Sequence, residues 1–259
     1  MVRDVWEAGD SYEAYVGRWS RRVAEVFVSW LDTGPALRWL DVGCGTGALT
    51  AAVLAGAEPR QVLGVDRSVP FLADATVRTG DPRAVFAAGN AMALPVRTGR
   101  FEAVISGLAL NFVPDAGRAV AELARVAAAG AVVAAYVWDY AEGMTMMRHF
   151  WAAAREVDPA AEAWDEGRRF PVCRPDALQA VWRAAGLREV STRRIEVPTR
   201  FAGFDDFWQP FLGGQGAAPA YLMSRPEPER AAIREVLRAR LPDAALDMTA
   251  AAWAVRGTR

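Results

Sequence analysis

The chain has 259 residues, and 53% of them are hydrophobic, which is enough for one large domain or for a domain with an elaborated cap. The 30 basic and 31 acidic residues leave a net charge of -1, so no overall field attracts nucleic acid or an anionic membrane. The two cysteines, Cys44 and Cys173, indicate neither a disulfide framework nor a metal site. No apolar run has the length of a signal peptide or a membrane span. These features predict a soluble cytoplasmic protein without a metal, and they leave its oligomeric state open.

The spacing of apolar residues predicts alternating helices and strands, which is typical of a mainly parallel α/β sheet. A helical stripe at Val23, Phe27, Trp30 and Leu31 precedes the first strand. The expected strands are 37–42, 62–66, 83–88, 101–106, 131–138, 187–198 and 247–256. The expected helices are 48–57, 69–78, 116–127, 143–157 and 175–185.

Two segments, 139–175 and 199–243, are too long to be simple connections in a compact sheet, so we expect them to form a cap. The expected division is an N-terminal helical lid at 1–36, a cofactor-binding core at 37–138, and a remainder at 139–259. That remainder completes the sheet and carries the cap within the same domain.

The most informative stretch is LDVGCGTG at residues 40–47, which links the first strand to a helix through Gly43, Gly45 and Gly47. Glycines allow a sharp turn and leave no Cβ in the way of a ligand, and the following helix start offers unpaired N–H groups. Asp41 lies just before this turn and would attract a cationic amine rather than a pyrophosphate. This combination suits S-adenosylmethionine, a nucleoside that carries an amino-acid tail and no phosphate.

Two further strand ends carry polar residues, and open α/β sheets bind ligands beyond the carboxyl ends of their strands. Asp66 ends the second strand, at a spacing from the glycine turn that suits hydrogen bonds to ribose hydroxyls. Asn90 follows the third strand, where its amide could accept from and donate to the edge of adenine.

With LDVGCGTG at 40–47, GVD at 64–66, GNAMALPV at 89–96 and FEAVISGLALNFVPD at 101–115, the chain resembles the class I S-adenosylmethionine-dependent methyltransferases. The likeness covers 37–138 and is strongest for the small-molecule branch that includes the ubiquinone and menaquinone biosynthesis methyltransferases. It implies a three-layer, Rossmann-like α/β sheet of seven strands in the order 3-2-1-4-5-7-6, with the last strand antiparallel. The segment LDMTAAAWAVRG near the C-terminus looks like that last strand.

The resemblance also implies a cofactor site, with Asp41 and the glycine turn at the methionyl group, Asp66 at the ribose, and Asn90 with Ala91 at the adenine. The residues expected to contact the cofactor are Tyr15, Arg18, Asp41, Gly43, Cys44, Gly45, Gly47, Asp66, Arg67, Asn90, Ala91, Met92 and Ser106. Those expected to contact the acceptor are Leu110, Asn111, Trp138 and Tyr140.

The chain departs from the family pattern at three places. Asn90 stands where the family most often has Asp, which keeps an acceptor oxygen. Ala128 and Ala129 replace a common Pro-Gly turn. Asn111 and Phe112 stand where many relatives carry histidine, so an obvious proton acceptor is missing and the substrate class stays open.

The N-terminal residues Tyr12, Tyr15, Arg18 and Trp19 precede the first strand. In similar methyltransferases such a segment folds over the cofactor, where an arginine can pair with its carboxylate. The alternative is an amphipathic helix packed on the edge of the sheet.

A catalytic base is not identified. His149, the single histidine, has a suitable ordinary pKa, but a structural helix histidine is the favoured interpretation. Asp139 could contact substrate or cap a helix. The aromatic residues and Met144, Met146 and Met147 hint at an apolar or aromatic acceptor, although core packing explains most of them.

The predicted activity is in-line transfer of a methyl group from S-adenosylmethionine, with S-adenosylhomocysteine as product, to an O, N or C atom of a small acceptor. A rival is an NAD(P)-dependent oxidoreductase, since Gly43, Gly45 and Ala48 also satisfy the dinucleotide-binding pattern. A third possibility is a non-catalytic S-adenosylmethionine-binding protein.

Overall fold

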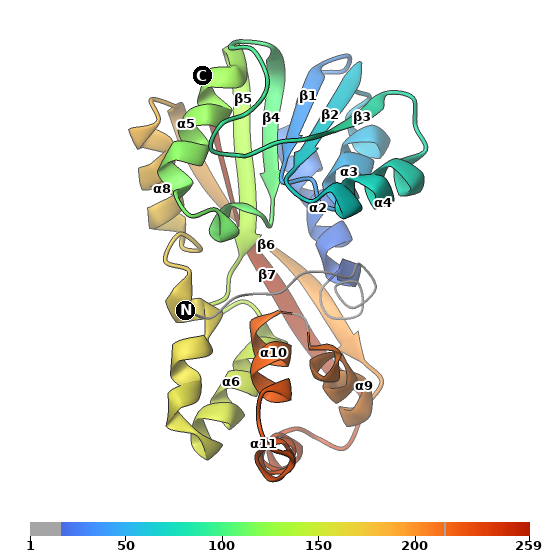
Figure 1. The fold of residues 1–259 in the computed structure, drawn as a ribbon, viewed down its shortest axis with the longest axis vertical. Helices are drawn as coiled ribbons and strands as arrows, with labels where there is room; N and C mark the ends of the chain where they lie inside the picture. Colours follow the sequence, from blue (N-terminus) through green and yellow to red (C-terminus); the bar gives the residue numbers. More distant parts are fainter. Residues whose placement is uncertain (1–16, 215) are drawn as a thin grey trace. The chain divides into compact units, whose positions relative to one another are not determined.

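The fold contains a seven-stranded sheet with the order β3-β2-β1-β4-β5-β7-β6 (Figure 1). The structure is a computed structural model that describes residues 17–214 and 216–259. The strands are β1 (Arg38–Val42), β2 (Gln61–Asp66), β3 (Ala84–Ala88), β4 (Phe101–Gly107), β5 (Ala127–Trp138), β6 (Arg188–Phe201) and β7 (Leu246–Thr258). The order that the family resemblance implied is confirmed.

The strands β1 to β5 are parallel, and β7 is antiparallel to β5. β1 pairs in parallel with β2 and β4, and β2 and β4 pair in parallel with β3 and β5. Along β7 the pairing runs the other way: the N–H of Asp139 donates to the carbonyl of Ala251 (2.9 Å), and that of Arg259 donates to Ala131 (3.0 Å). The expected antiparallel last strand is therefore confirmed.

Helices flank the sheet (Figure 1). The α-helices are α2 (Arg18–Leu31), α3 (Ala48–Gly56), α4 (Val69–Thr79), α5 (Ala116–Val126), α6 (Thr145–Val157), α7 (Glu166–Arg169), α8 (Pro175–Ala184), α9 (Phe204–Trp208), α10 (Ala217–Met223) and α11 (Glu227–Arg240). Short 3-10 helices are η2 (Leu110–Phe112), η3 (Pro159–Trp164) and η4 (Gln209–Gly213). Within the described ranges, none of these helices is both long enough and apolar enough to span a bilayer.

The largest difference from the expected boundaries is at β5, which begins at Ala127 instead of residue 131. Ala127 pairs with Phe101, and the register then shifts before Ala103 pairs with Val132. Gly130 has a left-handed φ of 77° in this shifted stretch. The regular pattern of apolar residues begins only after that irregularity. The sequence prediction therefore placed the start of the strand too late.

The described residues form two compact units. The parallel-strand unit contains Ser20–Val137, Val172–Ile195 and Ala252–Arg259. The helical unit contains residues 17–19, Trp138–Pro171 and Glu196–Ala251. The expected division into lid, core and cap stays a prediction, and the first 16 residues of the expected lid, including Tyr12 and Tyr15, lie outside the described residues.

Large aromatic side chains fill the core of the parallel-strand unit. Phe27 of α2 packs on Tyr136 of β5 with ring centroids 4.7 Å apart. Trp182 of α8 is fully buried, and its indole N–H donates to the carbonyl of Val133 (2.9 Å). This bond anchors α8 to a central strand, because a buried indole N–H needs a partner.

The helical unit has a separate aromatic core. Phe150 of α6 stacks on Phe211 with a centroid distance of 4.6 Å, and both rings are fully buried. Met144, Met146 and Met147 are at most 2% exposed. The interpretation of these rings and methionines as packing residues is confirmed.

We expect Trp182→Phe to lower the free energy of unfolding by about 1–3 kcal/mol, since it removes a buried hydrogen bond and leaves a cavity. Urea denaturation followed by circular dichroism measures this loss. Val77→Ala is the control because Val77 is 83% exposed and should change stability little. Equal losses in the two variants would contradict the anchoring role of Trp182.

Candidate cofactor site

The glycine turn between β1 and α3 is built for close approach. Gly43, Gly45 and Gly47 all have left-handed φ angles, of 74°, 53° and 87°. The N–H groups of Gly43 and Cys44 both donate to the carbonyl of Val65 in β2, at 2.7 and 3.2 Å. These bonds fix the turn at the carboxyl ends of the two strands.

The three glycines differ in what a side chain would meet. At Gly43 an added Cβ would lie 2.4 Å from Cβ of Ala109, and at Gly47 it would lie 3.1 Å from Oγ1 of Thr79. At Gly45 it would meet nothing within 4 Å. Gly43 and Gly47 therefore serve packing, whereas Gly45 faces open space from which a ligand could reach the backbone.

Asp41 is the most unusual charge in this unit. It is fully buried; its Oδ2 accepts a hydrogen bond from the hydroxyl of Thr50 (2.8 Å), and its Oδ1 has no partner among the described residues. Burial raises the pKa of Asp41 from 3.8 to about 7, the charge of Asp66 adds to this, and the bond from Thr50 opposes it. A buried carboxylate with one unused oxygen is suited to a cationic group of a ligand.

Asp66 at the end of β2 has its carboxylate fixed by two backbone groups. Oδ2 accepts from the N–H of Gly45 (3.0 Å), and Oδ1 accepts from the N–H of Ser68 (2.8 Å). Each oxygen keeps further acceptor capacity. The structure thus joins Asp66 to the glycine turn, at the strand ends where the sequence placed it.

The side chain of Asn90 forms a hydrogen bond within its own loop. Its Oδ1 accepts from the N–H of Met92 (2.9 Å), and its carbonyl accepts from the N–H of Ala93 (3.0 Å). The sequence hypothesis assigned both side-chain groups to adenine, but the oxygen already closes a turn of the Asx type. The amide nitrogen is the group left for a ligand.

Five other expected cofactor residues remain to be placed. The hydroxyl of Ser106 is buried and donates to the carbonyl of Val42 (2.8 Å), so it ties β4 to β1. Cys44 is buried, and this burial raises the pKa of its thiol, which stays protonated. Arg67 is exposed. Arg18 is the first residue of α2, whereas Tyr15 lies outside the described residues.

The loop after β4 holds the expected acceptor residues of the parallel-strand unit. Leu108 has a left-handed φ of 56°, which is uncommon for leucine. Asn111 is 8% exposed, and its Nδ2 has no partner in the described part of the chain. Strain and an unpaired buried amide on one short loop are features that functional sites often keep.

The remaining expected residues belong to the helical unit. Trp138 and Tyr140 are 3% and 4% exposed. Oδ1 of Asp139 accepts from the N–H of Glu142 (3.1 Å), which fits the turn-capping alternative. The pKa of His149 on α6 is lowered by burial and by the charge of Arg240, so the ring is neutral near pH 7.

Two notable residues were missed by the sequence interpretation. Thr50, which orients Asp41, is the one polar side chain in an otherwise apolar helix start, and that isolation was a usable signal. Glu166 in the helical unit is buried, which raises its pKa to about 7, and it accepts from the indole N–H of Trp151 (2.6 Å). Nothing in its sequence surroundings marks it. Within the described ranges, no group of three or more His, Cys, Asp or Glu is placed to hold a metal ion.

Comparison with known proteins agrees with this geometry. Residues 40–135 match the family described as "Methyltransferase domain". A demethylmenaquinone methyltransferase of Roseiflexus sp. is 33% identical over 173 residues, which cover 61% of this chain and 71% of that protein. The chain belongs to the class I S-adenosylmethionine-dependent methyltransferases.

Two further similarities are to a second sequence relative and to a solved structure. A 2-methyl-6-phytyl-1,4-hydroquinone methyltransferase of Synechocystis sp. is 31% identical over 190 residues, covering 72% of this chain and 58% of that protein. A phosphoethanolamine N-methyltransferase of Haemonchus contortus, solved with S-adenosylhomocysteine, superposes with a TM-score of 0.59 at 15% identity. The superposition covers 96% of this chain and 56% of the other chain, and at that identity it shows a shared fold.

The residues present fit the family's cofactor, S-adenosylmethionine. The unpartnered oxygen of Asp41 matches a cationic amine, and the open face of Gly45 leaves the backbone accessible. Asp66 presents a fixed carboxylate beside that face.

Substitution by alanine should have different effects at Gly43 and Gly45. We expect Gly45→Ala to lower the free energy of unfolding by about 1–2 kcal/mol, because residue 45 has a left-handed φ. The same variant should lose more than this in its free energy of binding to S-adenosylhomocysteine. Gly80→Ala is the matched control, because Gly80 also has a positive φ (57°) and open surroundings. Gly43→Ala should destabilise the fold more than either, since its Cβ would overlap Ala109. Thermal melts and binding titrations measure both effects, and an equal loss of affinity in Gly80→Ala and Gly45→Ala would contradict a ligand-facing role for Gly45.

Asp41→Asn should stabilise the ligand-free protein in a pH-dependent way. The folded pKa of Asp41 is raised to about 7, so stability falls as the pH rises from about 4 to 7 and the carboxyl loses its proton. Asparagine has no such proton to lose. The stability difference between variant and wild type should grow over this range to about 4 kcal/mol and level off above it. Urea titrations at several pH values measure this, and a difference that is flat with pH would contradict the burial of a charge at position 41.

Proposed function

We propose that this methyltransferase binds S-adenosylmethionine across the carboxyl ends of β1, β2 and β3 and methylates a small apolar or aromatic acceptor. The observation that carries the proposal is the buried carboxylate of Asp41 with its unused oxygen beside the open glycine turn. When bound, S-adenosylmethionine supplies a methyl group that its sulfonium already activates.

Asp41 would hold the ammonium of the methionyl group. A cation there offsets the desolvation that raises the pKa of Asp41, so charge and ligand stabilise each other. Thr50 keeps one carboxylate oxygen engaged and leaves the other directed to the ligand. The N–H groups at the start of α3, which has no side-chain cap, favour the carboxylate of the same group.

Asp66 and the Asn90 loop would hold the nucleoside. The carboxylate of Asp66 is already oriented by Gly45 and Ser68 and can accept from two neighbouring hydroxyls. Asn90 would donate its amide N–H to a ring nitrogen of adenine, while its oxygen maintains the turn to Met92. Ala91 and Met92 complete this side of the site.

The other expected contacts remain part of the proposal. In the parallel-strand unit, Arg67, Cys44 and Ser106 would line or support the cofactor site, and Leu110 and Asn111 would contact the acceptor. The assignments of Tyr15 and Arg18 to the cofactor, and of Trp138 and Tyr140 to the acceptor, stay predictions.

The acceptor class is inferred from two sources. The names of the Roseiflexus and Synechocystis relatives specify a demethylmenaquinone and a hydroquinone as what those enzymes act on. The loop after β4 offers Asn111, whose unpaired N–H can donate to an oxygen of the acceptor but cannot take its proton. An acceptor that is already ionised, such as a phenolate or an enolate, needs no base from this loop. The protein then contributes mainly alignment and exclusion of water, which can supply about 7–11 kcal/mol.

The dinucleotide alternative is disfavoured by charge. Asp41 and Asp66 lie close enough for one carboxylate to raise the pKa of the other. A pyrophosphate at the glycine turn would add negative charge to this pair.

Titration calorimetry with S-adenosylhomocysteine and NADH tests the cofactor. We expect binding of the first only, and at least about a tenfold loss of affinity in Asp41→Asn, since one charge-assisted hydrogen bond is worth about 1.5–3 kcal/mol. Labelled methyl transfer from S-adenosylmethionine to a panel of hydroquinones and phenols tests the acceptor. Binding of NADH alone would overturn the proposal, and cofactor binding with no transfer to any aromatic acceptor would overturn the acceptor class.

A further inference from the structure

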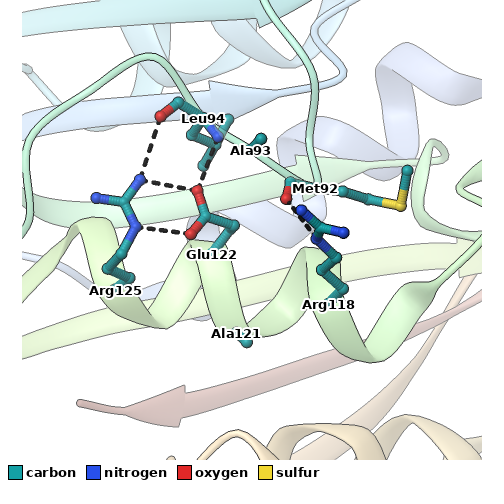
Figure 2. A pocket seen from close by; sticks show the side chains of 7 residues that line it. All are labelled: Met92, Ala93, Leu94, Arg118, Ala121, Glu122 and Arg125. Atoms are coloured by element: carbon teal, nitrogen blue, oxygen red, sulfur yellow. Dashed lines mark hydrogen bonds and ion pairs between the residues drawn. The ribbon is translucent and has the colours of Figure 1, made fainter.

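The connection 89–100 between β3 and β4 has almost no secondary structure of its own, yet it carries Asn90 and Met92. Its backbone polar groups need partners, as in any ordered segment. An open cavity of about 470 Å³ lies over its outer side, lined by residues 92–94 and by Arg118, Ala121, Glu122 and Arg125 of α5 (Figure 2). The residues that line this cavity include those that bind the connection.

Figure 2 shows that α5 supplies the partners. Glu122 accepts from the N–H of Leu94 through Oε2 (2.7 Å), and Nη2 of Arg125 donates to the carbonyl of the same residue (3.1 Å). Both backbone groups of Leu94 are thus bound by side chains, in the way that a neighbouring strand would bind them. The side chain of Leu94 is itself buried.

The same helix also binds other residues of the connection. Nη1 of Arg125 donates to the carbonyl of Val96 (3.1 Å), and Nε of Arg118 donates to that of Met92 (2.9 Å). The bound residues alternate at 92, 94 and 96, which is the period of an extended strand.

Glu122 and Arg125 also fix each other. Nε and Nη2 of Arg125 donate to the two carboxylate oxygens of Glu122, at 2.6 and 2.8 Å. This pairing lowers the pKa of Glu122 and keeps it ionised at neutral pH. A bidentate pair of this kind is geometrically specific, so it presents its remaining donors and acceptors in one arrangement.

We propose that Arg118, Glu122 and Arg125 are positioning residues that hold Asn90, Ala91 and Met92 ready for the adenine of S-adenosylmethionine. This inference rests on the proposed function, because it takes those residues as the adenine contacts. The link is short: Met92 is bound to Asn90 Oδ1 on one side and to Arg118 through its carbonyl on the other. Loss of the α5 contacts frees the connection, and bound cofactor must then order it again.

Glu122→Gln is the main test variant, and Glu102→Gln is its matched control. Glu102 accepts from the N–H of Arg38 (2.8 Å) and pairs with the Arg38 guanidinium, so it makes the same kinds of contact in the same unit. Arg38 begins β1, at the opposite end of that strand from Asp41. Arg118→Ala is a milder second variant, since Arg118 is exposed and its loss should leave the fold intact.

We expect Glu122→Gln to raise the Kd for S-adenosylhomocysteine and the KM for S-adenosylmethionine about tenfold, as for a binding-competent state populated about one tenth of the time. The kcat at saturating cofactor should stay unchanged, because bound cofactor orders the connection. Arg118→Ala should show a smaller rise of the same kind, and Glu102→Gln none. Hydrogen exchange of the ligand-free protein should show faster exchange of the Leu94 amide in Glu122→Gln only.

Faster exchange at Leu94 without a change in Kd would overturn the positioning role while leaving the proposed function intact. An equal rise of Kd in Glu102→Gln would overturn it as well, because the effect would then be general. If wild-type protein bound no S-adenosylhomocysteine, the proposed function would fail instead, and the exchange result would still report whether α5 holds the connection.

Discussion

The site depends on one buried carboxylate. Asp41 is removed from water beside Asp66 and is bound by a single neutral hydroxyl, that of Thr50. Such a group costs folding free energy unless a cation joins it, which is why its pKa is raised to about 7. The surrounding turn has three left-handed glycines and packs against Ala109 and Thr79, so it cannot relax to expose the charge without losing that packing. The lower stability at this position agrees with the proposed contact between Asp41 and a cationic ligand.

The fold and the position of Asp41 could be predicted from the sequence because their signals are local. An acid, three spaced glycines and a small-residue helix lie within one short stretch, and the strand order follows from the family that this stretch resembles. The start of β5 was misplaced because its first residues pair through a register shift that leaves no regular apolar pattern.

Side-chain partners were the part that sequence reasoning could not reach. Asn90 was expected to use both of its amide groups on a ligand, but its oxygen closes the turn to Met92. The hydroxyl of Ser106 bonds a backbone carbonyl on a neighbouring strand. Glu122 and Arg125 bind backbone atoms of residues 28 to 31 positions earlier in the chain. Contacts to main-chain atoms leave no complementary residue in the sequence, so charge patterning does not reveal them.

The dependence of the 89–100 connection on α5 bears on how this enzyme can be re-engineered. Loops that follow strands vary between relatives and carry many binding residues, so they are natural places to change ligand preference. A transfer of the 89–100 connection to a relative would have to include α5, because side chains of that helix bind the backbone groups of Leu94 and Val96. A chimera that takes the loop alone would carry the residues proposed to contact the nucleoside without the helix that holds them in place.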